Sequence, residues 1–141
     1  MSRILRPLWV VTVLSALSTA GLAGQDDGDD GQAAAEERTT SQGVFSADQA
    51  ARGEEVMWNI CSECHVDEDF GAAFLRSWDG ATVAALLEEI KSTMPEDNPG
   101  GMPDREYVDV IAYMFKLNGL PAGDAELEHG QLETIKIDIQ P

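Results

Sequence analysis

The sequence predicts a small all-α domain. Three segments carry apolar residues at helical spacing, with residues that can cap or stop a helix at their ends. Strand-like alternation is confined to residues 132–139, which we expect to pack as a short extended segment. The chain has 141 residues, which suits one domain of roughly a hundred residues with additional segments. We assign the folded domain to residues 45–141.

The first helix is predicted to begin after Ser46, a favourable N-cap residue, and to end near Asn59. Its apolar face contains Val56, Met57 and Ile60. Gly53 lies inside this pattern, where glycine costs about 1 kcal/mol relative to alanine. We therefore expect another helix to approach Gly53 closely, and a merely tolerated glycine is the alternative.

The segment after the first helix is predicted to be irregular. Residues 66–73 form a loop rich in Asp and Glu. Three apolar side chains follow in irregular backbone: Phe74, Leu75 and Trp78. We expect them to line a pocket if the domain binds a large apolar group, and to be ordinary core otherwise.

Two further helices are predicted over residues 83–91 and 104–117. Thr82 or Asp79 can cap the first of them, and acidic residues favour the first turn of the second. Residues 95–103 contain three prolines and two glycines, so we expect a non-helical loop between the two helices.

The N-terminal segment has the layout of a secretory signal. Arg3 and Arg6 precede an apolar run over residues 8–17, which is shorter than the roughly 20 residues of a membrane span. We expect residues 1–23 to be cleaved, which leaves a periplasmic protein without a stable membrane span; an uncleaved anchor is the alternative. Residues 24–44 are rich in acids and glycine and are expected to be a flexible linker.

The chain is strongly acidic, with 9 Lys and Arg against 26 Asp and Glu and a formal net charge of −17. Such a surface repels nucleic acid, which excludes nucleic acid as a partner. It favours encounter with a positively charged partner, although solubility alone would also explain the acidity.

The motif Cys61-Ser62-Glu63-Cys64-His65 has the spacing of a haem c attachment site. Two thiols one short turn apart can each add to one vinyl group of the same porphyrin. The next residue then falls beneath the iron, where its imidazole can coordinate the metal. We therefore predict one covalently bound haem c held by Cys61 and Cys64, with His65 as an axial ligand of the iron.

Three other interpretations of the motif remain open. A thioredoxin-like redox pair needs a strand before the motif and a βαβ unit around it, neither of which the sequence indicates. A closed zinc site needs four Cys or His ligands, and His129 is the only further candidate. The third interpretation is a disulfide with an accidental histidine beside it.

A second axial ligand is expected from the loop after the second helix. Met94 precedes a proline there, and a thioether in a loop can reach the iron without helical constraint. Met102, in the same loop and also before a proline, is the rival. Met57 and Met114 lie on predicted helices and are expected in the core, whereas His129 would give bis-histidine ligation.

The chain resembles class I cytochromes c over about residues 45–139. It looks most like the short bacterial cytochromes c that occur alone or fused to quinoprotein dehydrogenases. The matching stretches are Ala51-Arg52-Gly53, the attachment motif, Trp78-Asp79-Gly80, Thr93-Met94-Pro95, Asn98-Pro99-Gly100-Gly101, Ile111-Ala112-Tyr113 and the segment from Asn118 to Gly123.

The resemblance implies thioether positions at Cys61 and Cys64, His65 as proximal ligand and Met94 as its partner. Met102 matches a position that is usually aliphatic. The resemblance also implies that Gly53 lies where the first and last helices cross, with Tyr113 as the aromatic residue across that crossing.

Two positions depart from the family pattern. Val66 stands where glycine often follows the proximal histidine. No proline lies between His65 and Met94, although many members use a proline carbonyl there to accept a hydrogen bond from the histidine. Such a partner orients a ligand and tunes its basicity, and we expect a backbone carbonyl within residues 70–74 to take its place.

These features predict a one-electron carrier rather than an enzyme. It would pass electrons by outer-sphere transfer from a periplasmic dehydrogenase to a terminal oxidase or another cytochrome, through redox partners with a basic docking surface. The alternatives are a fixed cytochrome subunit of a quinoprotein dehydrogenase complex, a haem sensor with an open iron site, and a haem-free exported thiol protein.

Overall fold

The computed structural model describes residues 37–139. The predicted signal segment and the linker residues up to 36 lie outside this range. The main helices are α1 (Ala47–Val56), α2 (Ala72–Arg76), α3 (Val83–Thr93) and α4 (Asp104–Leu117). Shorter elements are the 3-10 turns η1 (Thr40–Gln42), η3 (Asp67–Phe70) and η4 (His129–Thr134), the π turn η2 (Met57–Cys61), and the strands β1 (Arg38–Thr39) and β2 (Ile135–Lys136).

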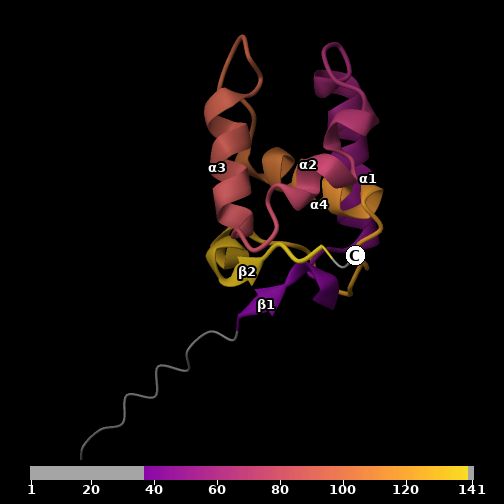
Figure 1. Ribbon diagram of the computed structural model, residues 1–141. Helices are drawn as coiled ribbons and strands as arrows, with labels where there is room; N and C mark the ends of the chain where they lie inside the picture. The colour runs from indigo at the N-terminus through magenta and orange to yellow at the C-terminus, as the bar shows by residue number, and fades with distance from the viewer. Residues whose placement is uncertain (1–36, 140–141) are drawn as a thin grey trace, which may run out of the picture. The chain divides into compact units, whose positions relative to one another are not determined.

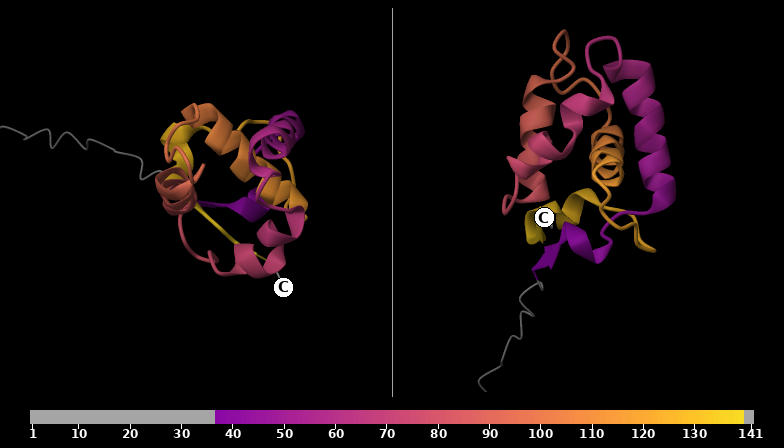
Figure 2. Two further views of the ribbon diagram at one scale, coloured as in Figure 1. Left: turned by 90° about the horizontal axis from the view of Figure 1, so that it is seen from above. Right: turned by 45° about the vertical axis from the view of Figure 1, so that its right-hand side comes forward.

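The described domain is predominantly helical, which confirms the all-α prediction. Helices α1 and α3 lie on opposite sides, with α2 and α4 between them, and the paired strands lie at one end (Figure 1). Figure 2 shows the same order from another side, with α4 between α3 and α1. No helix within residues 37–139 combines the length and the apolar character needed to cross a bilayer.

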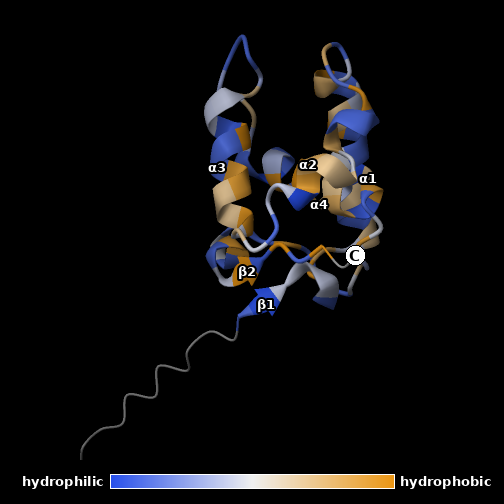
Figure 3. Cartoon of the chain, viewed as in Figure 1, coloured by the Kyte–Doolittle hydropathy of each residue, from blue (hydrophilic) through white to orange (hydrophobic). Residues whose placement is uncertain are grey.

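Helices α3 and α4 form where the apolar periodicity predicts them. Thr82 caps α3, since its side chain accepts the backbone N–H of Ala85 at 3.1 Å, so Asp79 is not the cap. The apolar side of α3 faces inward and its polar side faces outward (Figure 3). Helix α4 runs over residues 104–117, as predicted, and has the most buried residues of the four helices.

Helix α1 begins as expected, because the Ser46 hydroxyl accepts the backbone N–H of Gln49 at 3.1 Å. The regular helix ends at Val56, and the chain then widens into the π turn η2 rather than staying α-helical to Asn59. Gly53 packs against α4, where an added Cβ would overlap the backbone carbonyl of Asp109 and lie 3.0 Å from the Cβ of Tyr113. The prediction of a close helix crossing at Gly53 is confirmed.

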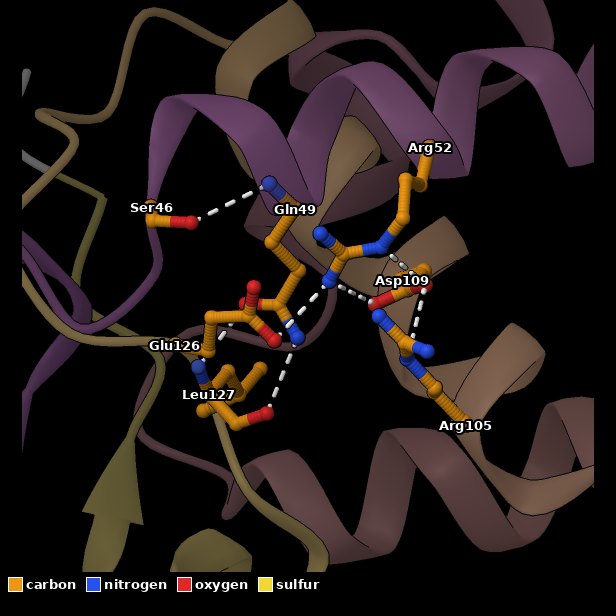
Figure 4. Close-up of polar contacts among 7 residues, drawn as sticks. All are labelled: Ser46, Gln49, Arg52, Arg105, Asp109, Glu126 and Leu127. Atoms are coloured by element: carbon orange, nitrogen blue, oxygen red, sulfur yellow. Dashed lines mark hydrogen bonds and ion pairs between the residues drawn. The ribbon is translucent and has the colours of Figure 1, made fainter.

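An ion pair between the buried Asp109 and the half-buried Arg52 holds the crossing of α1 and α4 together. Asp109 is 3 % exposed and accepts from Arg52 through both carboxylate oxygens, at 3.0 and 3.2 Å (Figure 4). Arg52 also lies 2.9 Å from a carboxylate oxygen of Glu126. The Gln49 amide donates to and accepts from the backbone of Leu127, at 2.9 and 2.8 Å. These contacts satisfy polar groups that would otherwise be costly to bury, and they fix the segment after α4 against α1.

Two expectations about the loop and linker are wrong in part. The loop after the attachment motif contains η3 and the short helix α2, and Leu75 in α2 is fully buried. Residues 38–44, assigned to the linker, belong to the packed domain. Strand β1 pairs in parallel with β2, and the buried Thr40 hydroxyl donates to the carbonyl of Asp138 at 3.2 Å and accepts its N–H at 2.9 Å. The linker prediction failed there because these partners lie about 98 residues away in the chain.

Candidate functional site

A cavity of about 910 Å³ opens between η2, α2, α3, α4 and the loops that follow η2 and α3. Its volume is at the upper end of the range for small-molecule sites, roughly 300–1,000 Å³. Most of its wall is apolar, with the buried or half-buried side chains of Met57, Phe70, Phe74, Ile90, Val110 and Met114. Such a wall suits a large apolar group with a few polar contacts.

The attachment motif lies at one side of this cavity. The π turn η2 ends at Cys61, and a tight turn follows in which the Cys61 carbonyl accepts the N–H of Cys64 at 3.1 Å and that of His65 at 2.9 Å. All three side chains line the cavity. Both thiols are free, and burial raises the pKa of the Cys61 thiol, whereas Cys64 is exposed. The motif follows a helix, not the strand that a thioredoxin-like pair requires.

The imidazole of His65 has an acidic neighbour that the sequence analysis missed. Its Nδ1 atom lies 3.5 Å from a carboxylate oxygen of Asp69, and the same oxygen accepts the backbone N–H of Val66 at 3.1 Å. The ring of Phe70 packs at 5.1 Å from the imidazole. The carbonyl of Phe70, inside the stretch where we expected an acceptor, instead accepts from the side-chain amide of Asn118 at 2.8 Å. The sequence signal that could have predicted this contact is the position of Asp69, an acidic residue four positions after His65.

The methionine loop, residues 94–102, lies at another side of the cavity. Met94 ends α3 with extended backbone, and both Met94 and Met102 line the cavity. Met102 also packs against the main apolar core. Met57 and Met114 are buried, as expected, and His129 is exposed on η4 and is not among the residues that line the cavity.

Only one of the three expected aromatic and aliphatic pocket residues lines the cavity. Phe74 faces it, whereas Leu75 belongs to the main core and Trp78 packs against that core. Phe74 and Leu75 differ because α2 is helical and successive residues of a helix point in different directions, whereas Trp78 lies beyond the end of α2.

The mouth of the cavity is acidic. Four carboxylates lie on its wall, those of Glu63, Glu89, Glu96 and Asp97, and no Lys or Arg does so among the described residues. Two exposed apolar side chains lie next to the attachment motif, Trp58 at 76 % and Val66 at 60 % exposure. The attachment motif therefore has both a cavity-lining carboxylate, that of Glu63, and exposed apolar side chains next to it in the chain.

The donor set fits haem c. One apolar cavity brings together two free thiols, an imidazole in the next position and a thioether from a separate loop. Thiols can form the covalent links, and imidazole and thioether are the usual axial ligands of cytochrome c iron.

Comparison with known families gives one match. Residues 48–114 match the family model described as cytochrome c oxidase, cbb3-type, subunit III. The matched range begins in α1, ends in α4, and contains the attachment motif and the methionine loop but not His129. No curated protein and no solved structure gives a significant match.

Proposed function

Since residues 48–114 form a class I c-type cytochrome domain, whose cofactor is covalently bound haem c, we propose that this chain is a monohaem one-electron carrier. In this proposal Cys61 and Cys64 attach the haem, and His65 and Met94 ligate its iron. Redox partners are part of the function of such domains. The observation that supports the ligand set best is that all four side chains line one cavity.

Met94 is the better candidate for the sixth ligand. Met102 packs against the main apolar core, so its side chain already has a structural role. Met94 is not among the side chains of either core cluster, yet it is half-buried on the cavity wall. A half-buried thioether without a packing role on the cavity wall is available for coordination.

The bound haem supplies an iron that accepts and releases one electron. The chain contributes the rest. With His65 and Met94 as its two ligands from the chain, the iron would offer no position to a substrate, so the chemistry that the haem would supply here is outer-sphere electron transfer. The apolar wall solvates positive charge poorly and so favours the ferrous state, in the same direction as a methionine ligand. The carboxylates at the mouth act in the opposite direction, but solvent and salt screen them.

The acidic mouth and the exposed Trp58 and Val66 suggest where partners dock. A partner with basic residues around an apolar contact would complement this side of the domain. We propose a periplasmic carrier between a dehydrogenase and a terminal oxidase or another cytochrome. A holoprotein that co-purifies stably with a quinoprotein dehydrogenase would instead identify it as a fixed subunit of that complex.

An absorption spectrum of the oxidised holoprotein tests the ligand set directly. We expect the red sulfur-to-iron band that reports methionine ligation. Met94→His should abolish the band and lower the midpoint potential. The matched variant Met102→Leu should retain the band and the midpoint potential of the wild type. The opposite pattern would identify Met102 as the ligand. A rapid spectral shift of the reduced protein on addition of carbon monoxide would contradict the carrier and indicate an open iron site.

A further inference from the structure

The hydroxyl of Tyr107 joins the two ends of the methionine loop. Tyr107 lies in the first half of α4 and has no solvent-exposed surface. Its hydroxyl donates to the backbone carbonyl of Met94 at 2.8 Å and accepts the backbone N–H of Met102 at 3.5 Å. A phenol can donate one hydrogen bond and accept another at the same time, so one atom can serve both ends of the loop.

We propose that Tyr107 is a positioning residue, which holds the backbone of Met94 so that its thioether stays available to the iron. This inference rests on the proposed function of Met94 as the sixth ligand. It goes beyond that proposal because it assigns to a residue outside the ligand set the task of keeping the ligand in place.

The hydrogen bonds of the loop support this assignment. The carbonyl of Met94 accepts a second bond, from the N–H of Gly100 at 3.2 Å, so this carbonyl is held from two directions. The other bonds inside the loop are short-range turns, such as the N–H of Asn98 to the carbonyl of Pro95 at 2.9 Å. The N–H of Met94 also donates to the carbonyl of Ile90 at 2.8 Å, which joins the start of the loop to α3. None of these bonds connects the loop to α4.

Tyr107 makes that connection to a rigid part of the domain. The residues of α4 from Tyr107 to Phe115 are all buried. Residues 96–101 are exposed, by contrast, and Met94 itself is only half-buried. A hydrogen bond to a buried helix restricts a loop whose own packing is sparse, because exposed segments with few contacts open most easily.

The chain provides a matched control. It has two tyrosines, both on α4, and the second one, Tyr113, does not line the cavity. Tyr113 lies at the crossing with α1, where burial, together with a hydrogen bond to Asp67, raises the pKa of Tyr113 to about 12. Tyr107→Phe and Tyr113→Phe therefore each remove one hydroxyl from the same helix, but only the first removes a contact to the methionine loop.

The experiment titrates the oxidised holoprotein with imidazole, which competes with methionine for the iron, and follows the loss of the sulfur-to-iron band. We expect Tyr107→Phe to bind imidazole about three- to tenfold more tightly than the wild type, which corresponds to the loss of a typical hydrogen bond. Tyr113→Phe should remain within about twofold of the wild type, since its hydroxyl makes no contact to the loop. Equal affinities for all three proteins, or equal shifts in both variants, would overturn the inference.

A wild type without the sulfur-to-iron band would contradict the proposed ligand set instead, so the two failures are distinguishable. If Tyr107→Phe does not yield holoprotein, amide hydrogen exchange of the wild type provides a second measurement. We expect the N–H of Met102 to exchange at least about tenfold more slowly than the exposed amides of residues 96 and 97. Exchange at the same rate would overturn the inference.

Discussion

The two sides of the cavity that carry the proposed axial ligands are built differently. On the histidine side, the chain from Cys61 to Asp69 is exposed or half-exposed throughout, and the polar neighbour of His65 is only four residues away. On the methionine side, the loop is fastened to a buried helix by Tyr107. The difference has a physical reason: thioether bonds can hold the histidine side to the haem, whereas the methionine side depends on the protein alone to stay in place.

The largest effect on stability is expected at Gly53, where α1, the helix before the attachment motif, packs against α4. Gly53→Ala places a Cβ against the carbonyl of Asp109 and forces α1 and α4 apart. We expect the free energy of unfolding of the holoprotein to fall by about 2–3 kcal/mol. Denaturant unfolding measures this loss.

The matched control for that variant is Gly130→Ala. An added Cβ at Gly130 meets nothing within 4 Å, and no positive φ constrains this residue. We expect a change within about 0.5 kcal/mol. Equal stability of the two variants would mean that the helices can separate at little cost, and the histidine side would then not depend on the crossing.

A smaller effect, on the midpoint potential, is expected at Asp69. Its negative charge beside His65 favours the more positive ferric state, so Asp69→Asn should raise the midpoint potential. Glu68→Gln removes the same charge from the neighbouring position and controls for the general field. Redox titration should show a clearly larger rise for Asp69→Asn. Equal rises would show that the contact with the imidazole has no specific effect.

The smallest effect is expected from two exposed lysine–carboxylate pairs, one at the methionine loop and one between α4 and α1. Lys91 and Asp104 lie 2.6 Å apart across the ends of the methionine loop, and Lys116 and Glu54 lie 2.7 Å apart between α4 and α1. Lys91→Gln and Lys116→Gln should each change the melting temperature only slightly, and the change should vanish in high salt. Only Lys91→Gln should alter imidazole affinity, and a matching change in Lys116→Gln would contradict this division of roles.

The first pair also has a defined pH window. The contact with Asp104 raises the pKa of Lys91, and the contact with Lys91 lowers the pKa of Asp104. Its contribution to stability is therefore present around neutral pH. It is lost as the pH falls through the lowered pKa of Asp104, and also as the pH rises through the raised pKa of Lys91.

Local signals in the sequence were enough to predict the helices and the motif. The caps Ser46 and Thr82 act on residues three positions away, and the periodicity of α4 is visible in consecutive residues. Gly53 was predictable because a glycine inside a helix needs a reason.

Contacts between distant segments were not predictable in this way. Thr40 finds its partner near the other end of the chain, and Tyr107 looks like one more apolar residue on α4 until the loop is folded over it. Asp69 was overlooked because a run of acids normally indicates a solvated surface. Sequence patterns report the local geometry of the chain, whereas contacts between distant segments depend on the whole fold.

The pairing of β1 with β2 has a consequence for protein engineering. It places one strand from near each end of the described domain side by side, at the end opposite the loops that follow α1 and α3 (Figure 1). A domain whose ends lie on the same face can be inserted into a surface loop of another protein or circularly permuted with little disturbance. A domain inserted in this way would be joined to its host at the end that carries β1 and β2, and the acidic mouth of the cavity would remain open to a redox partner.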